Sequence, residues 1–375
     1  MAIGEGRLEM THAIEIERRL IGPGQPTYIV AELSANHRGR LGDALALVQA
    51  AAEAGADAVK FQTYTADTLT IDANTEWFRI GEGTLWSGRT LYDLYQEAYT
   101  PWDWHPALKA EALRLGLQWF STPFDHTAVE FLATLDMPAY KIASFELVDT
   151  ALIADAARLG KPLIMSTGMA SWNEIDDAVA AARNMGNEQI ALLKCTSAYP
   201  APAAEMNLRV IPQLAARYQV PVGLSDHSPG HSAVVAAVAL GASIIEKHLT
   251  LDRSAGGPDA AFSLEPREFR ELVEAVRFAE RALGANDIVS TVEENRSRVF
   301  RRSLFVVEDV RQGEVFTTAN VRSIRPGHGL PPKHLPEVIG HRATCNIARG
   351  TPLDWKMVDA ILPSPLAGEG PGVRG

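Results

Sequence analysis

The chain has 375 residues, of which 46% are hydrophobic and 22% are charged, and its formal net charge is −11. This composition is typical of a globular protein with a sizeable core. The acidic balance argues against nucleic acid as a partner, because phosphate backbones attract basic surfaces. Two cysteines, Cys195 and Cys345, are too few for a disulfide scaffold and favour the cytoplasm. We find neither a secretory signal nor the roughly 20 consecutive apolar residues of a membrane span, so we expect no membrane partner.

Short β-rich runs alternate with Ala/Leu-rich helical stretches between residues 28 and 284. In chain order the runs are 28–36, 58–64, 118–124, 139–144, 162–168, 190–197, 221–227 and 243–250. Eight strands, each followed by a helix, predict an α/β fold with a closed parallel (β/α)8 TIM barrel. The alternative, an open doubly wound sheet, requires a Gly-rich phosphate loop after the first strand, and "AELSANHRG" is not such a loop.

The segments outside this barrel differ from it in pattern. Residues 1–27 include the alternating stretch "HAIEIERRLIGPG", which we expect to form a hairpin capping the barrel. Residues 285–297 are predicted to be a polar linker. Short strands with Gly/Pro turns predict a small β-rich domain over 298–360. Residues 361–375 are rich in Pro and Gly and are expected to be disordered.

Polar residues gather toward the C-terminal ends of several predicted strands, where barrel enzymes carry their active sites. Those that share a face within one strand are Glu32, Ser34 and Asn36; Lys60 and Gln62; Ser225 and His227; and Glu246 and His248. The run "IIEKHL" would cost several kcal/mol in a dry core if its polar groups lacked partners. We therefore expect this strand to end in a polar environment at the C-terminal end of the barrel, which we call the mouth.

His227 and His248 fall at matching ends of two neighbouring predicted strands. Such strands lie about 4.8 Å apart, so the two imidazoles can share one divalent ion and leave coordination positions open. Either histidine alone is more typical of a hydrogen-bonded core residue, but the matched placement favours a metal site. Mn, Fe, Zn and Mg-like ions all remain compatible with these ligands.

Lysines occur at the ends of three predicted strands, at positions 60, 141 and 194. Cations around one mouth favour a phosphate or carboxylate ligand, although a Schiff-base aldolase also places a lysine in a barrel strand. Simple alternation puts Lys141 on the face opposite Ser144 and Glu146. An early strand end or a bulge is required there for all three to reach the mouth.

Two further features bear on a substrate. Glu32 and Glu146 are the carboxylates available for proton transfer, although each is also suited to orienting a neighbouring lysine. The aromatic-rich run 85–106 suits a lid that packs on a sugar, with a core helix as the alternative.

These motifs together resemble the sialic acid synthase family from about residue 14 to residue 360. The motifs are "AELSANHRG", "VKFQTY", "STPFD", "PAYKIASFE", "STGM", "LLKCTSAYPAP", "GLSDHSPG", "EKHLTLDRSAGGPD" and "RPGHGL". Within the family, the chain most resembles the branch that makes pseudaminic acid. The resemblance implies a barrel followed by an antifreeze-like (SAF) domain and a domain-swapped homodimer. Arg38 and Ser197 depart from the usual pattern, and the second departure fits this branch.

The resemblance also implies an activity: metal-dependent condensation of phosphoenolpyruvate with an amino-sugar aldehyde and water, releasing phosphate. It assigns Mn²⁺ or Mg²⁺ to His227 and His248, and catalytic roles to Glu32, Glu146 and Lys60. The substrate-binding residues that it implies are Gln62, Thr122, Lys141, Ser144, Tyr199, Ser225, Asp259 and Arg325. Arg325 is expected to reach the site of the partner subunit.

Three other functions stay open. A synthase of N-acetylneuraminate or legionaminate would use another amino sugar. A Schiff-base aldolase would be insensitive to EDTA. A non-catalytic carbohydrate-binding protein would not need the histidine pair or Lys60, and all three residues are present.

Overall fold

The structure is a computed structural model that describes residues 13–284 and 287–359. The first 12 residues and the expected disordered tail, 361–375, lie outside the described residues. The chain divides into two compact units, the first ending at Gly284 and the second beginning at the next residue. Among the described residues, no helix has the length and apolar character needed to cross a membrane.

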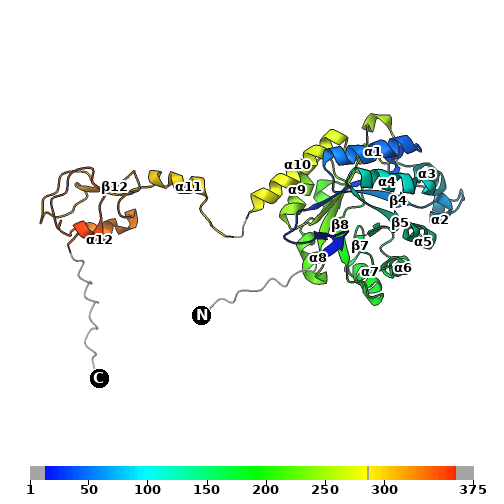
Figure 1. Cartoon of the computed structure of the whole chain (residues 1–375), viewed down its shortest axis with the longest axis horizontal. Helices are drawn as coiled ribbons and strands as arrows, with labels where there is room; N and C mark the ends of the chain where they lie inside the picture. The colour runs from blue at the N-terminus through cyan, green and yellow to red at the C-terminus, as the bar shows by residue number, and fades with distance from the viewer. Residues whose placement is uncertain (1–12, 285–286, 360–375) are drawn as a thin grey trace, which may run out of the picture. The chain divides into compact units, whose positions relative to one another are not determined.

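The first unit is a closed barrel of eight parallel strands, as the sequence predicts (Figure 1). The strands are β3 (Tyr28–Glu32), β4 (Ala58–Thr63), β5 (Gln118–Pro123), β6 (Tyr140–Ile142), β7 (Leu163–Ser166), β8 (Ile190–Cys195), β9 (Val222–Asp226) and β10 (Ile244–His248). Strand β10 pairs with both β9 and β3, which closes the sheet. The open-sheet alternative is therefore wrong.

A helix follows each barrel strand and covers the outside of the sheet (Figure 1). These helices are α1 (Leu41–Ala54), α4 (His105–Arg114), α5 (His126–Thr134), α6 (Thr150–Ala157), α7 (Trp172–Asn184), α8 (Val210–Tyr218), α9 (Ser232–Ala239) and α10 (Pro266–Leu283). The longer connection between β4 and α4 adds α2 (Ala66–Leu69) and α3 (Leu91–Ala98). Short 3-10 helices span Ser34–His37, Glu76–Phe78, Trp102–Trp104, Ala203–Glu205, Arg253–Ala255, Ala260–Phe262, Arg298–Phe300, Pro332–His334 and Trp355–Met357.

Helix α10 shows how the sequence determines this outer layer. Glu265 caps its start, and a proline stands at the first helical position, where no backbone donor is needed. The buried residues recur at helical spacing and form one apolar stripe against the barrel. They are Phe269, Leu272, Val273, Val276 and Ala279. Gly284 ends the helix with a positive φ of 57°.

The apolar stripe of α10 leads to a prediction about stability. Phe269 is fully buried, whereas Phe278 on the same helix is 66% exposed. We expect Phe269→Ala to lower the free energy of unfolding by about 3–5 kcal/mol, because the lost ring leaves a cavity. Phe278→Ala is the matched control and should stay within about 0.5 kcal/mol. Urea unfolding of the two variants measures the difference, and equal losses would contradict this packing.

The N-terminal hairpin covers the end of the barrel opposite the mouth. It consists of β1 (Ile14–Ile16) and β2 (Arg19–Ile21), and its isoleucines join the barrel's hydrophobic core. Gln118, the first residue of β5, donates a 2.9 Å hydrogen bond to the carbonyl of Ile16. Gln189, just before β8, accepts a hydrogen bond from a hairpin amide. The hairpin thus seals the N-terminal ends of the strands.

The second unit has its own small hydrophobic core. Strands β11 (Ser303–Val306) and β12 (Val321–Ile324) pair antiparallel, and α12 (Leu335–Val338) packs with them. Phe316 is fully buried in this core. Helix α11 (Val292–Ser297) lies within the segment predicted to be a polar linker, so part of that segment is helical.

Candidate active site

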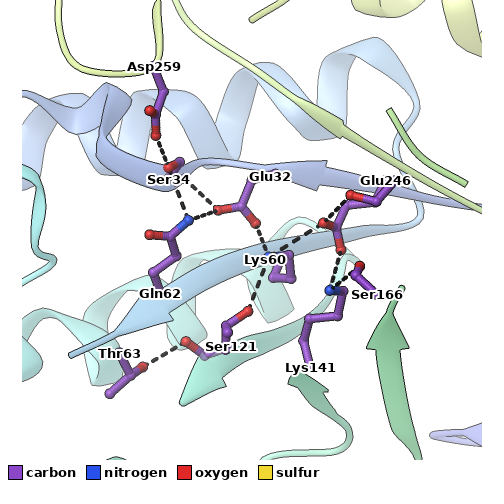
Figure 2. A network of polar contacts seen from close by, with 12 residues as sticks. Glu32, Ser34, Lys60, Gln62, Thr63, Ser121, Lys141, Ser166, Glu246 and Asp259 are labelled. Carbon is purple, nitrogen blue, oxygen red and sulfur yellow. Dashed lines mark hydrogen bonds and ion pairs between the residues drawn. The ribbon is translucent and has the colours of Figure 1, made fainter. Parts of the chain in front are cut away.

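A buried network of alternating charges occupies the C-terminal end of the barrel (Figure 2). Strand pairing places His248 beside Glu32 and Glu32 beside Lys60. The Lys60 ammonium lies 2.6 Å from Glu32 Oε2 and 3.6 Å from Glu246 Oε1, and it also donates to Thr122 Oγ1 at 3.1 Å. Lys60 therefore links two carboxylates of neighbouring strands.

Lys141, on β6, extends this network to Ser166 at the end of β7. Its Nζ lies 4.0 Å from Glu246 Oε2 and donates to Ser166 Oγ at 2.6 Å. Ser225 donates to the other Glu246 oxygen at 3.2 Å. Glu246 therefore stands between two lysines, in a position that can hold both in place for an anionic ligand.

All four charged groups of the network are buried, and their charged neighbours decide whether each pKa is raised or lowered. Burial lowers the pKa of Lys141. It would also lower the pKa of Lys60, but Glu246 and Glu32 outweigh it and raise that pKa. Burial raises the pKa of Glu32, whereas Lys141 and Lys60 outweigh burial at Glu246 and hold its pKa below the usual value. The lysines thus keep Glu246 ionised, whereas Glu32 is the carboxylate closer to protonation.

A hydrogen-bonded branch leads from Glu32 to the rim. Gln62 donates to Glu32 Oε1 at 3.0 Å and to Ser34 Oγ at 3.1 Å. The Ser34 hydroxyl in turn donates to Asp259, which follows the last barrel strand. Burial raises the pKa of Asp259. The branch connects the first, second and last strands around the mouth.

The two candidate metal ligands are neighbours at this mouth. The ring centroids of His227 and His248 lie 5.2 Å apart, and both side chains are buried. His227 Nδ1 lies 3.2 Å from the carbonyl oxygen of Thr196 and donates to it, so Nε2 is the nitrogen that carries the lone pair in the neutral ring. Burial would lower the pKa of His227, but contacts with Cys195 and with the Thr196 carbonyl outweigh it and raise that pKa, and a bound cation would favour the neutral ring. His248 Nδ1 is buried and has no hydrogen-bond partner within the described chain.

These observations fit a bound divalent ion. Burial, together with the nearby cations, holds the pKa of His248 well below its usual range, so its ring is neutral as a metal ligand must be. A backbone carbonyl orients His227, as is common for ligating histidines. Over residues 13–284 and 287–359, no group of three or more His, Cys, Asp and Glu side chains is placed to hold a metal. A two-histidine site leaves several positions for substrate and water.

The early end of strand β6 resolves the conflict over Lys141. Because β6 stops at Ile142, Ser144 and Glu146 lie in the following loop and are free of strand alternation. Ser144 accepts a 3.1 Å hydrogen bond from the amide of Gly168. A Cβ on Gly168 would come too close to the hydroxyl groups of Ser197 and Ser144, so a larger residue would displace these side chains. Lys141, Ser144 and Glu146 consequently line the same cavity.

Glu146 has a carboxyl group poised to titrate near neutral pH. Burial raises its pKa to about 7, and its Oε2 has no hydrogen-bond partner in the described ranges. The folded chain therefore binds more protons than the unfolded chain between about pH 4.3 and the raised pKa. Stability from this group is present at low pH and is lost as pH rises toward 7.

We expect Glu146→Gln to remove this pH dependence. The free energy of unfolding of the wild type, measured in urea between pH 5 and 8, should fall relative to the variant as pH rises. An ionisation near pH 7 in kcat/KM should disappear as well. Glu205→Gln, at an exposed position, serves as the control and should leave both profiles unchanged. Identical profiles for wild type and Glu146→Gln would contradict the assignment.

A cavity of about 400 Å³ opens above this network. Its floor is formed by charged and polar residues, including Lys60, Lys141 and Glu246. A second part of its lining, an apolar wall, comes mainly from the β4–α4 connection. The residues of that wall are Leu69, Ile80, Trp86, Leu91, Leu94, Tyr95, Ala98, Phe124 and Phe262. Part of the aromatic run therefore covers the mouth, as expected of a lid.

Trp86 fixes this wall to the rest of the mouth. Its indole nitrogen donates a 2.9 Å hydrogen bond to the carbonyl of Pro258, and its ring lies 5.7 Å from that of Tyr199. Tyr199 in turn lies 4.5 Å from the ring of His227. A ligand in the cavity is thus enclosed between aromatic rings and the charged floor.

The structure brings together all the predicted site residues of the barrel. Arg325 belongs to the second unit, where it is exposed. Lys194 does not join the other two lysines: it lines a separate cavity and donates to the carbonyl of its own neighbour, Cys195, at 2.5 Å. Sequence reasoning gave no role to Glu246 or Ser166. Glu246 shares a strand face with His248, and that signal was sufficient to find it.

The fold and this mouth define a barrel enzyme that carries a second, C-terminal domain. Residues 47–287 match the NeuB family and residues 301–359 match the SAF domain. The chain is similar to the pseudaminic acid synthase of Campylobacter jejuni, with 46% identity over 326 residues that cover 87% of this chain and 95% of that protein. It is 35% identical over 344 residues to the N,N'-diacetyllegionaminic acid synthase of Legionella pneumophila, covering 90% and 96%.

Solved structures agree with these similarities. The N-acetylneuraminic acid synthetase of Leptospira borgpetersenii, crystallised in complex with citrate, superposes with a TM-score of 0.68 at 33% identity, covering 76% of this chain and 95% of that one. The chain therefore belongs to the NeuB family of sialic acid synthases. It is a transferase of the nonulosonic acid synthase type, which excludes the Schiff-base aldolase and the non-catalytic binding protein.

Proposed function

We propose that this protein condenses phosphoenolpyruvate with 2,4-diacetamido-2,4,6-trideoxy-L-altrose and water, releasing phosphate and forming pseudaminic acid in the cytoplasm. The observation that carries this proposal is the mixed lining of the cavity, which combines the lysines of its floor with an apolar wall. The floor suits the phosphate and carboxylate of phosphoenolpyruvate. The wall suits the methyl terminus and acetamido methyl groups of a trideoxy sugar.

The charged network gives each residue a role in this reaction. Lys60 and Lys141 hold the anionic groups of phosphoenolpyruvate, while Glu246 keeps the two ammonium groups in place. The enol carbon attacks the aldehyde carbon, and water adds to the carbon that bore the phosphate ester. The lysines offset the negative charge as phosphate leaves. Hydroxyl groups of Ser144 and Thr122 complete the anion site.

Proton transfer falls to the two carboxyl groups that burial brings toward neutral pH. Glu146 borders the cavity with a pKa of about 7, so near neutral pH it can either donate or accept a proton. Glu32 is held by Lys60 and Gln62 and is the second candidate.

His227 and His248 would hold a divalent ion, Mn²⁺ or Mg²⁺, which supplies Lewis-acid polarisation of the aldehyde oxygen. The residues of this chain prepare the site. The carbonyl of Thr196 sets the tautomer of His227, and burial keeps His248 neutral. The ring of Tyr199 packs against that of His227 in a tilted contact and helps to hold it in place.

Phosphate release from phosphoenolpyruvate tests the choice of sugar. The purified chain with Mn²⁺ is supplied in turn with the L-altro sugar, with a diacetamido stereoisomer of it, and with N-acetylmannosamine. We expect the highest kcat/KM with the L-altro sugar, in keeping with the greater identity to the pseudaminic acid synthase. Equal or better turnover of N-acetylmannosamine would reject this choice and favour an N-acetylneuraminate synthase. Better turnover of the stereoisomer would favour a legionaminate synthase.

We further propose that the active form is a domain-swapped homodimer in which Arg325 of one copy binds the sugar at the mouth of the other. Arg325 is exposed in the second unit, and a guanidinium suits the polar groups of a sugar. Arg325→Ala is expected to raise KM for the sugar about tenfold or more and to change KM for phosphoenolpyruvate little. Arg322→Ala, at another exposed position of the same unit, is the control.

Subunit mixing separates a shared site from a self-contained one. Co-expressed Lys60→Met and Arg325→Ala chains form some heterodimers, in which one mouth has both an intact Lys60 and an intact partner arginine. At a sugar concentration well below KM, where Arg325→Ala alone has about a tenth of the wild-type rate, we expect the mixture to reach about a quarter of the wild-type activity, because random pairing makes half of the dimers mixed and each holds one complete site. No recovery above the two separate variants would contradict the shared site.

A further inference from the structure

A second buried ion pair lies outside the catalytic network. Lys247 Nζ is 2.6 Å from Asp226 Oδ2, and both side chains have essentially no exposed surface. The two residues are register partners on β10 and β9. Because side chains alternate along a strand, this pair faces the helical layer while His227 and His248 face the mouth. Each member of the pair directly precedes one of the two histidines.

Stability does not explain why charged residues occupy these positions. Exchanging a buried ion pair for apolar side chains of similar volume is often neutral or stabilising, because desolvation offsets the attraction. The outer face of a barrel strand normally packs apolar groups against helices. A pair retained there is better explained by the geometry that it fixes.

The ion pair connects the two strands at the point where their backbone hydrogen bonding ends. The register between β9 and β10 runs no further than Asp226 and Lys247. Beyond it, Asp226 Oδ1 accepts a 2.9 Å hydrogen bond from the amide of Ser228, and the Lys247 ammonium donates to the carbonyl of the same serine. Both backbone polar groups of the residue after His227 are thus bound to side chains of this pair.

We infer that Asp226 and Lys247 are positioning residues that set the spacing of His227 and His248 for a divalent ion. The pair connects the end of β9 to the end of β10 and clamps the backbone on the far side of His227. Without it, the two rings, now 5.2 Å apart, would lose their fixed separation. The inference rests on the proposed metal dependence and adds residues that touch neither the ion nor the substrate.

Metal binding, measured separately from turnover, tests this role. Mn²⁺ is titrated into the metal-free full chain, and free Mn²⁺ is followed by electron paramagnetic resonance. We expect the wild type to bind one ion and Asp226→Leu/Lys247→Met to bind it about 10–100-fold more weakly, the range for lost outer-shell partners. The urea midpoint of this double variant should stay close to that of the wild type. Lys247→Met alone keeps the bond from Asp226 to the Ser228 amide, and it should weaken binding about tenfold.

A matched control excludes general loosening of the barrel. Val222→Ala removes buried methyl groups from the same strand, β9, without touching the ion pair. It should lower the urea midpoint yet leave the Mn²⁺ affinity within about threefold of the wild type. If its affinity falls as far as that of the ion-pair variants, the pair has no special role in positioning.

The outcomes distinguish this inference from the proposed function. Tight Mn²⁺ binding by the wild type, with unchanged affinity in both Asp226→Leu/Lys247→Met and Lys247→Met, overturns the positioning role and leaves the metal proposal intact. Absence of Mn²⁺ binding by the wild type overturns the metal proposal and this inference together. If the double variant does not fold, Asp226→Asn/Lys247→Met, which keeps the size of the aspartate and leaves no buried charge unpaired, decides between the outcomes.

Discussion

Replacing Lys60 with methionine is expected to lower kcat/KM for phosphoenolpyruvate by about 10³-fold. Methionine fills a similar volume but removes the ammonium that links Glu32 and Glu246. Loss of one preorganised charge-stabilising group typically costs 10²–10³-fold in rate. Here the two carboxylates are also left facing an anionic substrate. Steady-state phosphate release measures the effect, and a loss below about tenfold would contradict the central place of Lys60.

The same substitution has a pH-dependent effect on stability. Removing one member of a buried ion pair costs about 3–5 kcal/mol, because a charge is left without its partner. Without Lys60, burial raises the pKa of Glu32 further in the folded variant, while Lys141 still lowers that of Glu246. The folded variant then binds more protons than the unfolded chain, so its stability falls as pH rises above about 4.3. We expect a larger destabilisation at pH 8 than at pH 5.

Lys161→Met is the matched control for Lys60→Met. The Lys161 side chain is 41% exposed and pairs with Asp136, which is 85% exposed. An exposed ion pair contributes about 0–1 kcal/mol, so activity and urea midpoint should both stay near the wild type. A similar loss in both variants would show that the methionine substitution, rather than the buried network, is responsible.

Much of the barrel could be predicted from the sequence because its strands are short, apolar and separated by helices with clear stop signals. The run 243–250 illustrates both the success and its limit. Its apolar start predicts a strand, which the structure confirms as β10, and its polar end predicts a mouth. Sequence alternation does not report how early a strand ends. That is why Lys141 and Glu146 seemed to conflict until β6 was seen to stop at Ile142.

The candidate site was harder to predict wherever a side chain depends on tertiary neighbours. Lys194 has the same kind of sequence context as Lys60 and Lys141, yet it lines another cavity. Ser166 is an ordinary strand serine until Lys141 donates to it. Trp86 gains its place through a hydrogen bond to Pro258, which is 172 positions away in the chain. Contacts at such separation are set by the closure of the barrel and not by any local pattern.

His248→Ala is expected to abolish metal-dependent turnover while the barrel stays folded. The side chain is one of two imidazoles at the mouth, and a single remaining histidine cannot hold a divalent ion tightly. We expect the Mn²⁺ affinity to fall by more than about 100-fold, beyond the usual effect of losing an outer-shell partner. Because the His248 side chain lines the cavity at the end of β10 and is not part of the barrel's hydrophobic core, unfolding in urea should remain cooperative. Mn²⁺ titration and phosphate release, measured on one preparation, test both parts.

His126→Ala provides the comparison for this effect. His126 is 59% exposed on α5 and forms surface contacts with Glu130 and Asp155. It should bind Mn²⁺ and turn over substrate as the wild type does. Full activity of His248→Ala after EDTA treatment would contradict the metal site, since phosphate release would then not need an ion held by the two histidines. Retained activity that EDTA still abolishes would instead place the ion on other ligands of the mouth, of which Glu246 lies nearest in sequence on the same strand face.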